Sequence, residues 1–211
     1  MNTNNEIIGY MGHKGIADKE LEALVSMCLE KLETVSSPRK VIMQLSCTVT
    51  ENCATIGVLN IESKQLAAYL CNCTQVFAFA ATLGAAVDRL ISKLIKTDST
   101  EALCVQACAA AQIEDYCNGI EQELSHDINR HELYLLPRIS PGYGDFDIKH
   151  QTSLLRILQA YKSIGVTETK AHMLTPLKSV TAVIGVSIKT PGVLDKCADC
   201  SKIDCQFRRV E

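Results

Sequence analysis

The stretch from residue 99 to about residue 126 constrains the fold most, because its pattern is that of one long helix. Ser99 is a candidate N-cap, and Glu101 places a negative charge in the first turn, where the helix dipole favours it. Residues 104–113 are almost all small and apolar, so this part of the helix has no polar face. A helix that is apolar all round is buried. We therefore expect this helix to run through the centre of the domain.

Shorter patterns surround this helix. Apolar residues at helical spacing predict helices at 17–35, 86–96 and 148–161. Alternating, β-branched segments predict strands at 41–50, 54–60 and 180–188, with a hairpin turn at Glu51 and Asn52, whereas residues 75–82 suit either a strand or a helix. The helices and strands are mixed without a regular βαβ rhythm, which favours an α+β fold over a doubly wound sheet.

Length and charge exclude several classes of protein. The 211 residues suit one domain that is large enough to bury its core without disulfide or metal staples. A net charge of −3 creates no basic field for nucleic acid or anionic lipid. No apolar run approaches the ~20 residues of a membrane helix, and the polar N-terminus does not resemble a secretion signal. We expect no nucleic-acid or membrane partner and a cytoplasmic location.

The chain has eleven cysteines, which fall into two groups. In a reducing compartment, free cysteines in apolar context behave as small core residues. We expect this of eight: Cys28, Cys47, Cys53, Cys71, Cys73, Cys104, Cys108 and Cys117. The other three, Cys197, Cys200 and Cys205, lie close together near the C-terminus, where three thiolates suit Zn or an iron–sulfur cluster with a fourth ligand from elsewhere. An unmetallated tail and a redox dithiol are the alternatives.

A loop at 137–145 is the best candidate for a binding site. The chain lacks the G-x-G-x-x-G and P-loop phosphate cradles, and it lacks the H-E-x-x-H and G-x-S-x-G motifs. The loop itself combines two prolines and two glycines, which stiffen it and allow close backbone approach. Arg138 offers a planar fork for a carboxylate, and Tyr143 offers a flat ring with a hydroxyl. These features indicate a small-molecule cradle; an ordinary surface turn is the alternative.

The loop resembles the R-x-x-x-G-Y loop of the reactivation domain of cobalamin-dependent methionine synthase. Further segments resemble the same family in the same order, namely 6–12, 82–84, 87–90, 113–117, 164–166 and 173–181. The resemblance spans roughly residues 6–188, and the ordered set is more specific than any single segment. It implies a stand-alone reactivation domain over residues 1–190, followed by a cysteine-rich tail over 191–211.

The resemblance implies a fold and a set of site residues. The fold is a single α+β domain, a twisted antiparallel sheet with a long buried helix and flanking helices. S-adenosylmethionine would lie in a shallow groove beside the loop, with Arg138 on its methionine carboxylate and backbone groups of Ser140 and Gly142 on its nucleoside and methionine parts. Glu114 would bind the positively charged or hydroxyl-bearing part of the ligand, or else would only meet a solvent-facing neighbour on its helix. Tyr143, as the catalytic residue, would sit against the corrin near cobalt.

The resemblance also implies a function. The domain would support reductive methylation of cob(II)alamin on a partner methionine synthase, with an electron from a donor such as flavodoxin and the methyl group from S-adenosylmethionine. Two departures from the family matter: residues 188–192 replace a tyrosine pair that touches the ligand, and there is no D-x-H-x-x-G motif, so cobalamin must come on the partner. The alternatives are an activator of another corrinoid methyltransferase that uses the C-terminal cysteines, and a non-catalytic module that senses S-adenosylmethionine or corrinoid.

Overall fold

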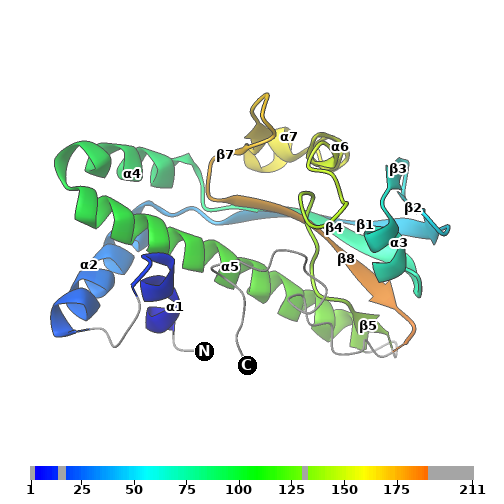
Figure 1. The fold of residues 1–211 in the computed structure, drawn as a ribbon, viewed down its shortest axis with the longest axis horizontal. Coiled ribbons are helices and arrows are strands. Elements are labelled where there is room, and N and C mark those ends of the chain that lie inside the picture. Colours follow the sequence, from blue (N-terminus) through cyan, green and yellow to red (C-terminus); the bar gives the residue numbers. More distant parts are fainter. Residues whose placement is uncertain (1–2, 14–17, 130–132, 190–211) are drawn as a thin grey trace.

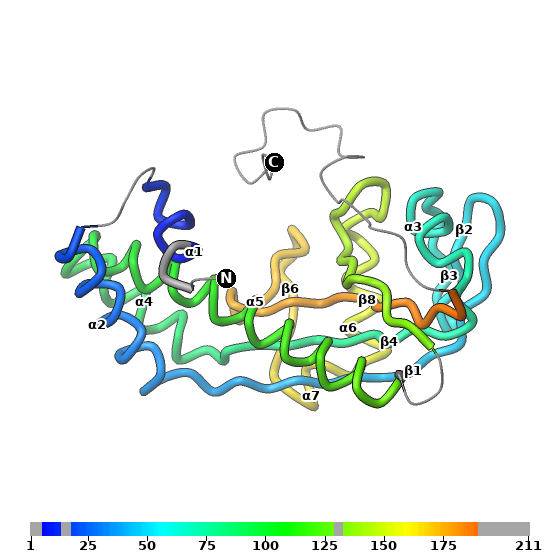
Figure 2. Tube along the Cα trace, turned by 90° about the horizontal axis from the view of Figure 1, so that it is seen from below, coloured from blue at the N-terminus to red at the C-terminus, as the bar shows by residue number. Residues whose placement is uncertain are grey.

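The computed structural model describes residues 3–13, 18–129 and 133–189. These residues form a six-stranded sheet in the order β3-β2-β1-β4-β8-β5, in which all paired neighbours are antiparallel. The strands are β1 (Arg39–Val49), β2 (Cys53–Ile56), β3 (Leu59–Glu62), β4 (Cys73–Thr82), β5 (Tyr134–Leu135) and β8 (Ser179–Ser187). Figure 2 shows β1, β4 and β8 side by side along the long axis of the molecule. A separate two-stranded hairpin consists of β6 (Thr167–Glu168) and β7 (Leu174–Thr175).

Helices cover both faces of the sheet (Figure 1). One face packs against α1 (Thr3–Tyr10), α2 (Lys19–Val35), α4 (Ala85–Thr97) and α5 (Ser99–Asn129). The other packs against α3 (Lys64–Tyr69), α6 (His150–Ile157) and α7 (Ala160–Ile164). The expected α+β fold, with an antiparallel sheet and a long helix, is therefore confirmed.

The central strand β4 is buried on both faces, which explains why the sequence at 75–82 suited either a strand or a helix. Phe77 and Phe79 point into the core beneath α5, whereas Ala78 and Ala80 point into the opposite core. Successive side chains of a strand face opposite sides, and here both sides are buried. The strand is therefore an apolar run without the polar alternation that marks a strand with one solvated face.

The long helix α5 is buried in its middle, as expected, and Cys104, Val105 and Cys108 are fully buried there. The N-cap of α5 was predicted at Ser99 but lies one residue earlier, at Asp98. Asp98, not Ser99, accepts hydrogen bonds through Oδ1 from the backbone N–H groups of Thr100 and Glu101, both at 3.0 Å. A carboxylate at this position satisfies two unpaired N–H groups and also meets the positive end of the helix dipole.

Two predicted elements are each divided in two. The strand expected at 54–60 turns at Gly57, whose φ of +58° is in the left-handed region, and becomes β2 and β3. The helix expected at 148–161 breaks at Gln159, with a φ of +48°, and becomes α6 and α7. The short helices α1 and α3 were not expected, because neither is long enough to show a clear apolar period.

The expectation for the eight scattered cysteines is right for six and wrong for two. Cys53 is half-buried, because it begins the short strand β2, and Cys71 is exposed in the turn between α3 and β4. Burial raises the pKa of the Cys28, Cys73 and Cys117 thiols to about 12, so they stay protonated and inert.

Two predictions concern the end of the chain. Cys197, Cys200 and Cys205 lie outside the described residues, and so does the expected domain boundary at 190–191. Within the described ranges, no cluster of three or more His, Cys, Asp or Glu side chains is arranged to hold a metal ion. No helix in these ranges has the length and apolar character needed to cross a bilayer.

Candidate functional site

The loop from Pro137 to Phe146 begins as an extension of the sheet edge. Ile139 and Val183 of β8 exchange two backbone hydrogen bonds, N–H to O at 3.0 and 2.9 Å. Adjacent side chains of an extended segment point to opposite faces. Ile139 accordingly packs into the core beneath α6 and α7, whereas Arg138 reaches α5 on the other face.

Arg138 is held by three side chains of α5. Its Nη1 donates to Glu121 Oε1 at 2.5 Å and to Asn118 Oδ1 at 2.9 Å, and its Nη2 donates to Glu114 Oε2 at 2.5 Å. Residues 114, 118 and 121 follow the i, i+4, i+7 spacing, so they lie on one face of the helix. The planar guanidinium thus reaches across two turns of α5.

The arrangement is partly desolvated and carries excess negative charge. The Arg138 side chain is 17% exposed, against 28% for Glu121 and 41% for Glu114. Burial opposes the charge on Arg138, but the hydrogen bonds and charges of Glu121 and Glu114 outweigh burial and raise its pKa. One guanidinium faces two carboxylates, so these three groups together carry a net charge of −1.

The far end of the loop is anchored to α3. The Asp145 carboxylate accepts hydrogen bonds from the Ser63 hydroxyl and from the backbone N–H groups of Lys64, at 2.8 Å, and Gln65, at 3.3 Å. The hydrogen bond from Ser63 is the largest cause that lowers the pKa of this carboxyl, and the backbone donors add to it. The carboxylate also lies at the N-terminus of a helix, where the exposed N–H groups favour an anion.

Two further hydrogen bonds hold the loop. The Tyr69 hydroxyl donates to the backbone oxygen of Pro137, and the buried Phe146 fixes the turn by accepting from Gly142 N–H at 2.7 Å. Gly142 has a φ of +98°, which suits glycine. The loop is therefore held both by a hydrogen bond within it and by contacts with α3.

A cleft of about 250 Å³ opens between the loop, α5 and β8. Glu114 lines it from α5, and Arg138, Ser140 and Tyr143 line it from the loop. Leu174 of β7 and residues 179–181 at the start of β8 form the remaining wall with Gln151 of α6.

Gln151 is a buried polar group in this wall. Its Oε1 accepts from the Thr181 hydroxyl at 3.1 Å, and its Nε2 donates to the His172 carbonyl at 2.6 Å. These bonds connect the cleft to the β6–β7 hairpin. Gln151 was missed in the sequence, because a glutamine in an amphipathic helix has no local signature.

Four of the five residues predicted for ligand binding or catalysis line this one cleft: Arg138, Ser140, Tyr143 and Glu114. Gly142 is in the same loop but is not part of the lining, and its N–H is engaged with Phe146. Tyr143 is on the rim, with 63% of its surface exposed.

The partners of Arg138 were also missed. Asn118 and Glu121 contact its guanidinium, and their spacing from Glu114 along α5 was visible in the sequence. A polar i, i+4, i+7 stripe on a mostly buried helix needs a partner, and that could have indicated them.

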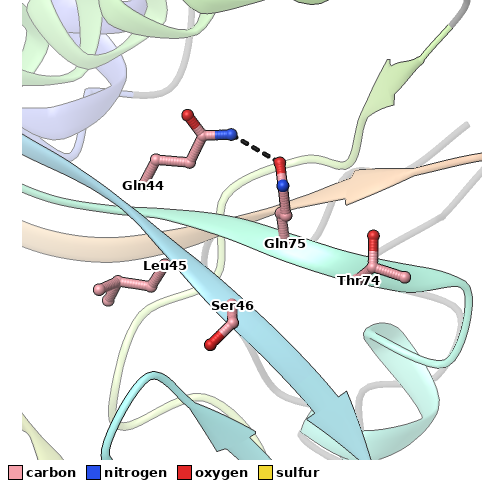
Figure 3. A pocket seen from close by; sticks show the side chains of 5 residues that line it. All are labelled: Gln44, Leu45, Ser46, Thr74 and Gln75. Atoms are coloured by element: carbon pink, nitrogen blue, oxygen red, sulfur yellow. Dashed lines mark hydrogen bonds between the residues drawn. The ribbon is translucent and has the colours of Figure 1, made fainter.

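A second hollow lies on the sheet, lined by Gln44, Leu45, Ser46, Thr74 and Gln75 (Figure 3). It is larger, about 400 Å³, and Gln44 Nε2 donates across the strands to Gln75 Oε1 at 2.6 Å. Among the residues that the structure describes, no charged side chain lines it. The cleft at Arg138 adds charged side chains, Arg138 and Glu114, that can orient a charged ligand, so it is the better candidate.

No protein-family model matches the sequence, and neither does any curated protein. Among solved structures, the chain is similar to the crystal structure of the MetH reactivation domain bound to AdoHcy (S-adenosylhomocysteine), with a TM-score of 0.66 and 16% sequence identity. The match covers 85% of this chain and 69% of that chain. The resemblance seen in the ordered sequence segments is thus confirmed in three dimensions, and this chain has the fold of the methionine synthase reactivation domain.

Proposed function

We propose that this protein is an S-adenosylmethionine-binding reactivation subunit in the cytoplasm. It supports reductive methylation of cob(II)alamin on a partner cobalamin-dependent methionine synthase. The observation that carries the proposal is the cleft at the Arg138-x-x-x-Gly142-Tyr143 loop, where Arg138, Tyr143 and Glu114 meet within this fold. AdoHcy, which the structural neighbour binds, is the product that remains after S-adenosylmethionine has given up its methyl group.

The charges of the cleft fit S-adenosylmethionine. The ligand carries a sulfonium, an ammonium and a carboxylate, a net charge of +1, and the Glu114–Arg138–Glu121 group carries −1. Arg138 would bind the carboxylate through its guanidinium, and Glu114 would face the cationic part. Backbone groups of Ser140 and Gly142 would contact the remainder of the ligand.

The size of the cleft suits a ligand that passes its methyl group to another protein. Pockets that enclose a small ligand usually measure about 300–1,000 Å³. A cleft of about 250 Å³ holds only part of S-adenosylmethionine and leaves the rest accessible. The exposed ring of Tyr143 at the rim would then contact the corrin of a docked partner.

The chain supplies no acid, base or nucleophile in this scheme. An external donor such as flavodoxin provides one electron to the partner's cobalt(II). The methyl group then leaves the sulfonium without its bonding electrons and bonds to the reduced cobalt, while the electron pair of the broken C–S bond stays on sulfur. The contribution of this protein is to position the sulfonium, which lowers the entropic part of the barrier.

Calorimetry with S-adenosylmethionine tests the proposal, with and without a cobalamin-loaded methionine synthase that lacks its own reactivation domain. We expect binding that tightens with the partner, and methylation of the corrin, followed by its absorption, once a reductant is added. Absence of binding in both conditions would reject the site.

The alternatives predict different outcomes of the same experiment. Binding without corrin methylation would indicate a sensing module. Methylation only of a different corrinoid protein, with iron or zinc bound at Cys197, Cys200 and Cys205, would indicate an activator of another corrinoid methyltransferase.

A further inference from the structure

Arg138 presents its two terminal nitrogens to different surroundings. Nη2 is bound to Glu114, which lines the cleft together with Arg138, whereas Nη1 is bound to Glu121 and Asn118, which are not part of the lining. Glu114 is also the more exposed of the two carboxylates, at 41% against 28%. One nitrogen is thus bound to a residue of the cleft, and the other is bound to two residues outside its lining.

We propose that Glu114 occupies the carboxylate subsite of Arg138 in the ligand-free protein and is displaced when an α-amino-acid group enters. We further propose that Glu121 and Asn118 are positioning residues that keep the guanidinium in place during this exchange. The inference rests on the function proposed above and deepens it, since it states what fills the Arg138 subsite before the ligand binds and what holds Arg138 in place.

The charges explain why the exchange favours a zwitterion. An incoming carboxylate takes the place of Glu114 on Nη2, and the incoming ammonium pairs with the Glu114 carboxylate that has been released. One ion pair is replaced by two. A ligand with a carboxylate but no ammonium would leave Glu114 without a partner in a partly desolvated cleft, which is costly.

The role of Glu121 follows from the same geometry. Without an anchor on Nη1, the guanidinium would follow Glu114 instead of staying in position for the ligand. The 2.5 Å contact with Glu121 and the 2.9 Å contact with Asn118 fix the plane of the fork from behind. Two directed hydrogen bonds donated by one nitrogen define an orientation, which a single point charge would not.

Three ligands separate these roles in calorimetric titrations. They are S-adenosylmethionine, its decarboxylated form, which keeps the sulfonium and the amine, and its 2-oxo analogue, which keeps the carboxylate but has no amine. For Glu121→Gln we expect about tenfold weaker binding of S-adenosylmethionine, as for a weakened charged hydrogen bond, and unchanged binding of the decarboxylated form. Asn118→Ala is a second variant for which we expect the same ligand dependence with a smaller factor.

Glu114→Gln tests the exchange itself. We expect weaker binding of S-adenosylmethionine, because the partner of the ammonium is lost, and tighter binding of the 2-oxo analogue than in the wild type, because nothing competes for Nη2. The control is Glu123→Gln, which removes a carboxylate of the same helix that pairs with Lys40 instead. It should change no affinity.

The outcomes distinguish the two proposals. If the wild type binds none of the ligands, the proposed function is rejected and this inference falls with it. If the wild type binds S-adenosylmethionine but Glu121→Gln weakens all three ligands equally, Glu121 is only structural. Weaker binding of the 2-oxo analogue by Glu114→Gln would overturn the exchange and leave the proposed function standing.

Discussion

Gly185→Ala adds one methyl group at a crowded point of the sheet. Gly185 is in β8, and its carbonyl accepts from the N–H of Leu136, just before the loop that carries Arg138. A Cβ at this position would lie 2.7 Å from Cys73 Sγ, 2.9 Å from Leu136 Cδ1 and 2.9 Å from Leu70 Cδ2. Its φ is not positive, so alanine suits the backbone and the substitution tests packing alone.

The expected cost follows from these contacts. Cβ atoms essentially never come within 3.0 Å of another heavy atom, so all three neighbours must move. Leu70 follows α3, Cys73 begins β4 and Leu136 follows β5, and all three are at least nine-tenths buried in a core that is already close-packed. Such overpacking costs about 1–3 kcal/mol. For a chain of this length, a loss of about 2 kcal/mol lowers the Tm by roughly 4–8 °C.

The assay is urea unfolding followed by circular dichroism, with Gly119→Ala as the matched control. A Cβ at Gly119 on α5 meets nothing within 4 Å, so the same change should stabilise that helix by about 0.5–1 kcal/mol. Because Leu136 leads into the loop, Gly185→Ala should also weaken S-adenosylmethionine binding. Equal stability of Gly185→Ala and the wild type would refute the packing argument.

Three further predictions concern the loop. Arg138→Ala should weaken S-adenosylmethionine binding by about 1.5–3 kcal/mol, as for a lost charged hydrogen bond, and unchanged affinity in calorimetry would reject the assignment. Tyr143→Ala should spare this binding but reduce corrin methylation, and equal loss of both would contradict the separate role of Tyr143. The lowered pKa of Asp145 means that its stabilising contribution is present above the usual aspartate range and is lost as the pH falls through the folded value. At pH 6, Asp145→Ala should therefore unfold at lower urea concentration than the wild type, with a free energy of unfolding that is about 1 kcal/mol smaller. This difference in free energy should shrink towards pH 3. A difference that is the same at both pH values would show that the carboxylate charge is not responsible.

Local patterns in the sequence predicted most elements of the fold. The helix α5 and the strands β1 and β8 follow from apolar periods that operate over neighbouring residues. Errors occurred where a single residue decided the outcome, as at Gly57 and Gln159, whose positive φ values split two elements. Such a residue affects the period of its segment very little, so the pattern does not reveal the break.

The sequence by itself determined which residues could bind a ligand, because the chemistry of Arg138, Tyr143 and the glycine-containing loop resides in the side chains and in local backbone freedom. Only the tertiary structure decided what those residues meet. Arg138 lies 24 residues from Glu114 and 17 from Glu121 along the chain, and no local period records that distance. The pairing of β5 and Ile139 with β8 brings Arg138 over α5, and the same pairing makes Gly185 too crowded for a side chain. Contacts between distant segments depend on how the sheet and helices pack together, and that packing is a property of the whole chain.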